Sequence, residues 1–125
     1  MHTCSGGCHC GQVRFAVDIP DRVIVHRCNC SICKKSGYLH LIVPADRFRL
    51  LQGGERLVEY RFHTGVARHL FCGTCGIKSF YIPRSHPDGY SVNLNCLDLP
   101  DGVDVVIEDF NGRNWSANRE QLPDS

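Results

Sequence analysis

The chain has 125 residues, of which 42% are hydrophobic, and this length and composition predict one globular domain rather than a disordered segment. A net charge of +1 at pH 7 argues against nucleic acid or an anionic membrane surface as a partner. Apolar runs of only a few residues exclude a spanning helix, and the first residues lack the apolar stretch of a signal peptide, so we expect a cytoplasmic protein.

Short β-strands are predicted along most of the chain. The first follows a glycine- and cysteine-rich segment at residues 6–11, and apolar residues alternate with more polar ones over residues 13–17. Similar runs follow at residues 23–25, 38–43, 46–51, 57–62, 66–71, 77–82, 90–94 and 103–107. The Thr64-Gly65 turn predicts a hairpin between the two runs that flank it. No segment has the 3.6-residue apolar period of a long helix, although one helical turn is expected near residues 116–121, so the predicted fold class is mostly β.

Nine cysteines are far more than a chain of this length usually contains, and an odd number cannot all pair as disulfides within one chain. Seven of them fall into three tight clusters: Cys8-x-Cys10, Cys28-x-Cys30-x2-Cys33 and Cys72-x2-Cys75. In an intracellular protein this spacing favours metal binding over a disulfide framework, and zinc is the expected metal. Cys4 and Cys96 lie outside the clusters, and we expect Cys4 to be a spare thiol in the N-terminal segment.

The central segment, residues 28–33, holds three of these thiols. A structural zinc usually has four protein ligands, whereas a reactive zinc keeps three and leaves the fourth position to water or substrate. Two divisions of the seven cysteines are therefore open. In the first, the N-terminal pair joins Cys72 and Cys75 in a closed four-thiolate site, and the central segment forms an open three-thiolate site. In the second, the central segment recruits a fourth ligand from the N-terminal pair or from Cys96. The first division is favoured because it needs no ligand outside the clusters.

Four motifs follow one another along the chain: Gly-Gly-Cys-His-Cys-Gly-Gln-Val-Arg-Phe at 6–15, Cys-Asn-Cys-Ser-Ile-Cys-Lys-Lys at 28–35, Phe-Cys-Gly-Thr-Cys-Gly at 71–76 and Asn-Cys-Leu-Asp at 95–98. In sequence and order they resemble the glutathione-dependent formaldehyde-activating enzyme family, which includes centromere protein V. The resemblance runs from about residue 6 to Trp115. Residues 80–85 and 110–112 look closest to the centromere protein V branch of that family.

This resemblance implies an Mss4-like fold of short coiled antiparallel β-sheets stapled by zinc, in one zinc-binding domain over residues 1–125. It implies a structural zinc on Cys8, Cys10, Cys72 and Cys75 and a catalytic zinc on Cys28, Cys30 and Cys33. The implied activity is a carbon–sulfur lyase reaction run in the synthetic direction, which joins glutathione and formaldehyde into S-hydroxymethylglutathione. The expected partners are then a glutathione-like thiol and a small aldehyde, and the expected cofactor is zinc, with two ions per chain.

Three basic residues are candidates for contacting the carboxylates of such a thiol: Lys34, Lys35 and Arg84. The two lysines directly follow the central segment, where they could offset its negative charge or be ordinary solvated side chains. Arg84 lies in a predicted turn and could clamp a carboxylate or be a surface arginine. We expect His9, between two ligands, to be exposed or to support the site without binding metal. Cys96 either lies near the open site or fills buried space as a small apolar side chain.

A non-catalytic, zinc-stapled interaction module is the alternative function, because the resemblance to centromere protein V permits it. Such a module would be expected to carry a basic or disordered extension that engages a polymer, and the near-neutral charge of this chain does not favour it. A third reading keeps the open zinc site and replaces the substrates by another thiol or another small aldehyde.

Overall fold

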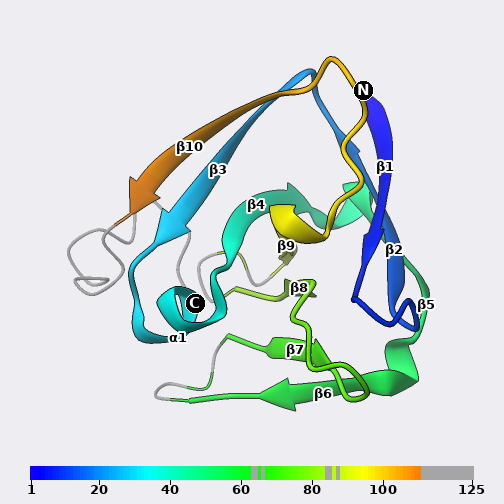
Figure 1. The fold of residues 1–125 in the computed structure, drawn as a ribbon, viewed down its shortest axis with the longest axis vertical. Helices are drawn as coiled ribbons and strands as arrows, with labels where there is room; N and C mark the ends of the chain where they lie inside the picture. The colour runs from blue at the N-terminus through cyan, green and yellow to red at the C-terminus, as the bar shows by residue number, and fades with distance from the viewer. Residues whose placement is uncertain (63–64, 66, 84–85, 87, 111–125) are drawn as a thin grey trace.

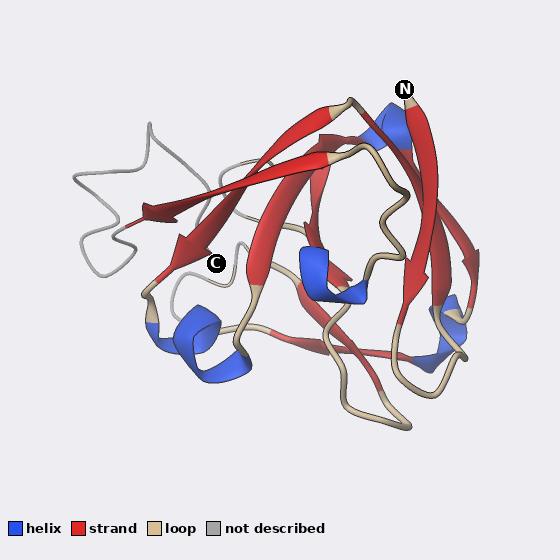
Figure 2. Cartoon of the chain, turned by 45° about the horizontal axis from the view of Figure 1, so that its top comes forward, coloured by secondary structure: helices blue, strands red, loops and turns tan. Residues whose placement is uncertain are grey.

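The computed structural model describes residues 1–62, 65, 67–83, 86 and 88–110, which fold into three small β-sheets (Figure 1). The strands are β1 (His2–Gly7), β2 (Arg14–Ile19), β3 (Arg22–Cys28), β4 (Leu39–Pro44), β5 (Phe48–Gln52), β6 (Leu57–Tyr60), β7 (His69–Cys72), β8 (Phe80–Tyr81), β9 (Gly89–Asn93) and β10 (Asp104–Phe110). The helical elements are α1 (Ser31–Ser36) and three short 3₁₀ turns, η1 (Ala45–Arg47), η2 (Gly54–Arg56) and η3 (Leu94–Cys96). Strands dominate the described chain, which confirms the predicted mostly β fold class (Figure 2).

The three sheets have the strand orders β1-β2-β5, β10-β3-β4-β9-β8 and β6-β7, and most neighbours pair antiparallel. The predicted hairpin is present as β6 and β7. The exception to antiparallel pairing is β10, which runs parallel to β3 until Phe110 lies beside Cys28. There the backbone N–H of Asn29 donates to the carbonyl oxygen of Phe110 at 3.2 Å. The parallel pair therefore ends at the first cysteine of the central segment and fixes its position.

The main core is built around Phe15 of β2, which is completely buried. Its ring stacks on Phe48 of β5 with 5.2 Å between centroids and meets Phe80 of β8 edge-on at 5.7 Å. Phe48 also stacks on Tyr90 of β9 at 4.1 Å. Since β2 and β5 belong to one sheet and β8 and β9 to another, this aromatic cluster joins the two sheets.

Truncating Phe15 to alanine is expected to lower the free energy of unfolding by about 3–5 kcal/mol, because a buried aromatic ring is lost and a cavity remains. Leu51→Ala is the control, since Leu51 of β5 is 61% exposed and should change stability by less than about 0.5 kcal/mol. Chemical denaturation followed by circular dichroism gives both values. Similar losses for the two variants would show that Phe15 does not anchor the core.

The N-terminal strand β1 was not among the predicted elements, and Cys4 is not a spare thiol in a loose terminus. Cys4 is buried, and it pairs with Val17 in the antiparallel register of β1 and β2. Near the end of β1 the two backbones approach so closely that a side chain at Gly7 would collide with the carbonyl oxygen of Val13. The strand therefore depends on β2 and on the absence of side chains at its end, which alternation of apolar residues does not reveal.

Two further departures concern helices and strand lengths. The run predicted at 77–82 is a strand only over Phe80–Tyr81, and the central segment leads into the short helix α1. The helical turn expected near residues 116–121 lies outside the described residues. Within the part of the chain that the structure describes, no helix combines the length and apolar character needed to cross a bilayer.

Candidate metal centres

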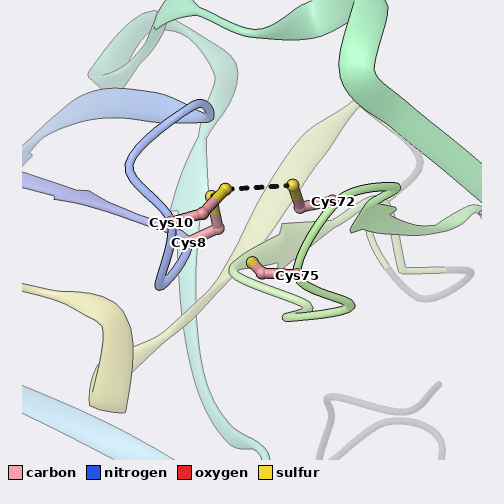
Figure 3. A group of neighbouring side chains, drawn as sticks. All are labelled: Cys8, Cys10, Cys72 and Cys75. Atoms are coloured by element: carbon pink, nitrogen blue, oxygen red, sulfur yellow. Dashed lines mark hydrogen bonds between the residues drawn. The ribbon is translucent and has the colours of Figure 1, made fainter.

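Four cysteines from two distant loops converge on one point (Figure 3). Cys8 and Cys10 lie in the turn between β1 and β2, while Cys72 ends β7 and Cys75 follows it. All four sulfur atoms lie within 4.8 Å of one another. The Sγ atoms of Cys8 and Cys10 are 3.6 Å apart, and those of Cys10 and Cys72 are 3.7 Å apart. We call this set the four-cysteine group; it could hold a metal ion.

Backbone amides surround the sulfur atoms of this group. The N–H of Val13 donates to Cys8 Sγ at 3.3 Å, and the N–H of Thr74 donates to Cys72 Sγ at 3.4 Å. For Cys75, burial acts to raise the pKa, but backbone hydrogen bonds outweigh it and lower the pKa to about 6. Hydrogen bonds from the backbone also lower the pKa of Cys72. Cys72 and Cys75 thus favour the thiolate form, whereas for Cys10 a backbone hydrogen bond that acts to lower the pKa is outweighed by burial and by hydrogen bonds with the other thiols, which raise the pKa to about 11. A closed set of four sulfur ligands is the donor set that structural zinc prefers.

The central segment gathers the other three clustered thiols. Cys28 ends β3, Cys30 is the N-cap of α1, and Cys33 lies one helical turn later, so all three sulfur atoms come within 4.8 Å of one another. All three side chains are buried. The turn is held by the N–H of Lys34, which donates to the carbonyl of Cys30 at 3.0 Å. Among the described residues, no histidine, carboxylate or further cysteine joins this three-cysteine group as a fourth ligand.

Two thiols of the three-cysteine group, Cys28 and Cys33, favour the protonated form when no metal replaces the proton. The hydrogen bond with Cys30 and then burial raise the pKa of Cys28 to about 12. Hydrogen bonds with Cys28 and Cys30, together with burial, also raise the pKa of Cys33. Three sulfur donors within one short segment suit zinc as a ligand set. Zinc binds the thiolate form of cysteine, so binding would release the thiol protons.

A buried histidine supports the three-cysteine group from β4. His40 is fully buried, and its Nε2 lies 3.0 Å from the sulfur of Cys33. Its Nδ1 lies 3.0 Å from the hydroxyl of Ser91 and 3.2 Å from the hydroxyl of Tyr81. Burial, followed by the charge of Lys78, lowers the pKa of His40 to about 3, so the ring is neutral. A hydroxyl that donates to Nδ1 leaves Nε2–H to donate to Cys33, which orients that sulfur.

A cavity of about 720 Å³ opens beside the three-cysteine group. Cys28 and Cys33 are in its wall, together with the exposed Lys34 and the ring of Tyr38. Arg27 also lines it and is paired with Asp109, Nε to Oδ1 at 2.8 Å. The cavity wall thus holds two thiols, the basic Lys34 and the Arg27–Asp109 ion pair, and the cavity volume is in the range of small-molecule sites.

The structure separates the remaining predicted residues. Lys35 lines a different cavity, with Tyr60 and Phe62, and is not in the wall that holds Cys28 and Cys33. His9 is exposed. Cys96 is half-buried, belongs to neither cysteine group, and lines another cavity of about 460 Å³. Arg84 lies outside the described residues.

Sequence reasoning missed a set of polar and aromatic side chains behind the three-cysteine group: His40, His69, Lys78, Tyr81 and Ser91. They come from four strands or strand ends and meet only in the folded chain. The one signal in the sequence is Lys78 itself, because a lysine between Ile77 and the apolar run at 80–82 is unusual for a strand that packs on a core.

Comparisons with known proteins show the family to which the chain belongs. Residues 3–113 match the glutathione-dependent formaldehyde-activating enzyme family. A Halomonas elongata protein, provisionally named a glutathione-dependent formaldehyde-activating enzyme, is 31% identical to this chain over an alignment 132 residues long. The match covers 93% of this chain and 82% of that protein. The crystal structure of a Rhodobacter sphaeroides protein has a TM-score of 0.69 and 33% identity to this chain, and the match covers 83% of this chain and 99% of that one. The chain therefore belongs to the glutathione-dependent formaldehyde-activating enzyme family.

Proposed function

We propose that this protein is a zinc-dependent enzyme of the carbon–sulfur lyase type, which joins glutathione or a similar thiol to formaldehyde or another small aldehyde. With glutathione and formaldehyde the product is S-hydroxymethylglutathione. The proposal is carried by one observation: in a member of this family, a buried three-cysteine group with no fourth ligand among the described residues borders a cavity of about 720 Å³. The predicted cytoplasmic location belongs to the same proposal, since none of the nine cysteines is in a disulfide, as expected in a reducing compartment.

Two zinc ions would have different tasks in this proposal. The four-cysteine group would hold a structural ion, since its four sulfur atoms leave no position for a substrate. Cys28, Cys30 and Cys33 would hold the second ion. Bound there, zinc would supply a Lewis acid that keeps a substrate thiol deprotonated and polarises a carbonyl.

The residues around the cavity would then bring the two small reactants together. Lys34 and Arg27 present basic groups to a carboxylate-bearing thiol, and His40 holds the Cys33 sulfur in place. In the reaction the thiolate sulfur attacks the aldehyde carbon, the carbon–sulfur bond forms, and the carbonyl electron pair moves to oxygen, which takes up a proton. Holding both reactants in contact can supply about 7–11 kcal/mol of a barrier to such an addition.

Exchange spectroscopy with carbon-13-labelled formaldehyde and glutathione tests this activity, because the adduct also forms without a catalyst. We expect zinc-loaded protein to raise the exchange rate between free and thiol-bound formaldehyde well above the spontaneous rate, and a chelator to return it to that rate. Metal analysis in parallel should find two zinc ions per chain. Exchange at the spontaneous rate with every thiol offered, at full metal content, would instead support a non-catalytic zinc-stapled module.

Lys34→Ala is expected to raise the KM for glutathione by about 2- to 5-fold at unchanged kcat, the size of one solvent-exposed ion pair. Lys34 lines the cavity beside Cys28 and Cys33, whereas Lys35 lines a different cavity. Lys35→Ala, with the same loss of charge one residue later, should leave KM unchanged. Steady-state kinetics compare the two variants. An equal rise in KM would point to general electrostatic attraction rather than to a contact in the cavity.

A further inference from the structure

Lys78 places an ammonium group in an aromatic pocket behind the three-cysteine group. Its Nζ lies 2.6 Å from Nδ1 of His69, 3.9 Å from the ring centroid of Tyr81 and 4.9 Å from that of Tyr38. Among the described residues, none of the ion pairs includes Lys78. The side chain is half-buried, and Asn93 holds its backbone by donating from Nδ2 to the Lys78 carbonyl at 3.2 Å. Within the described residues, this shielded cation therefore has no carboxylate at ion-pair distance.

His69 cannot be the group that balances this charge. An ammonium only donates, so Nδ1 of His69 must accept and the ring proton lies on Nε2. That Nε2 is buried and has no hydrogen-bond partner within the described part of the chain. Burial, and then the charge of Lys78, lowers the pKa of His69 to about 3, which keeps the ring neutral. His69 therefore fixes the ammonium without adding or removing charge.

Deprotonated thiols of the three-cysteine group would act on Lys78 as negative charges. Burial lowers the pKa of Lys78 to about 8, and negative charge on Cys33 and Cys30 opposes that change. Below that pKa the amine is protonated, so Lys78 is a cation at neutral pH. Packed side chains connect Lys78 to the three-cysteine group. The ring centroids of Tyr38 and His40 are 4.6 Å apart, and Nε2 of His40 contacts the sulfur of Cys33.

Zinc binding at the three-cysteine group would supply the negative charge that balances the ammonium group of Lys78. Zn²⁺ held by three thiolates carries one net negative charge, because the thiols release their protons when they bind the ion. In a buried site such a charge is costly unless a positive charge lies nearby. The exposed Lys34 is a weaker candidate for this role than Lys78, because solvent screens it.

We propose that Lys78, held by His69 over the rings of Tyr38 and Tyr81, is the counter-cation of the three-cysteine centre and strengthens its binding of zinc without being a ligand. The inference rests on the proposed metal role of Cys28, Cys30 and Cys33. Lys78 is a positioning residue in this sense: it acts through the charge of the thiolates and touches neither the metal nor the substrate.

Competition titration of metal-free protein with zinc and a chromophoric chelator tests the inference. Lys78→Met, which removes the charge and keeps the stem, is expected to weaken binding of the second zinc by about 10- to 100-fold. Zinc binding to the four-cysteine group should not change in the same sample. Cys30→Ser, which lacks one thiol of the three-cysteine group, shows which binding step of the titration belongs to the four-cysteine group. Lys78→Arg should restore most of the affinity. Lys34→Met, which removes the same charge from an exposed position, should cost less than about fivefold.

Cobalt substitution provides a second readout, because cobalt–thiolate absorption reports occupancy of both cysteine groups and the spectrum of Cys30→Ser gives the contribution of the four-cysteine group. If Lys78→Met does not fold, Lys78→Gln carries the same comparison with a polar head in the pocket. Unchanged affinity for the second ion in a folded neutral variant would overturn the inference and leave the proposed function standing. A wild-type chain that binds one ion only would overturn both.

Discussion

Replacing Cys75 by serine is expected to unfold the protein or make it aggregate. The four-cysteine group joins the turn after β1 to the end of β7, so one ion would tie together segments more than sixty residues apart, as the separation of 62 between Cys10 and Cys72 shows. Structural zinc contributes about 10–16 kcal/mol in small peptides, whereas a whole domain is stable by only about 5–15 kcal/mol. Even a partial loss of the metal contribution is therefore comparable with the total stability.

Thermal unfolding and far-ultraviolet circular dichroism measure this effect. Cys96→Ser is the matched control, because Cys96 is a half-buried thiol that belongs to neither cysteine group. It should keep the native spectrum and both metal ions, while Cys75→Ser loses the cooperative transition. A Cys75→Ser protein that melts like the wild type would show that the four-cysteine group does not hold the fold together.

The second large effect is expected for Cys30→Ser, which should keep the fold and lose the activity. Cys28, Cys30 and Cys33 lie within six residues, so an ion bound there closes only a short local loop. The core around Phe15 and the four-cysteine group do not depend on it. Losing a metal worth several kcal/mol in the transition state corresponds to a fall of at least about 100-fold in the catalysed exchange rate.

Metal analysis and the exchange measurement together test this variant. We expect one zinc ion per chain, a native melting curve and exchange near the spontaneous rate. Cys4→Ser provides the control for removing a buried thiol outside both groups, and it should keep its activity. If Cys30→Ser lost the fold as completely as Cys75→Ser, the separation into a structural and a reactive centre would be wrong.

Short-range pattern was enough to predict most strands and to show which cysteines are clustered. Alternation from Val13 to Val17 marks β2 because one face of that strand packs against the core. The turn at 64–65 marks the β6–β7 hairpin because the two strands are adjacent in sequence. The two close pairs and the triplet of cysteines are likewise local, so ligand counting suggested the four-plus-three division that the structure brings together.

Features that depend on contacts between distant segments could not be predicted in the same way. β1 exists because β2 pairs with it, and the parallel contact of β10 with β3 joins strands that are about 80 residues apart, as Asp104 beside Arg22 shows. The helix α1 is a single turn that has no amphipathic period, and it ends at Gly37 with φ of 64°. The Lys78 pocket is assembled from several strands, and a lysine beside an apolar run does not by itself show which distant side chains its ammonium group meets.

Zinc-edge anomalous diffraction from crystals of the zinc-loaded protein tests the unequal division of the sulfur ligands directly. We expect two peaks: one enclosed by the four sulfur atoms of Cys8, Cys10, Cys72 and Cys75, the other bound by Cys28, Cys30 and Cys33 with a water or substrate molecule completing its coordination. A single peak, or a protein side chain as a permanent fourth ligand of the second ion, would contradict this division.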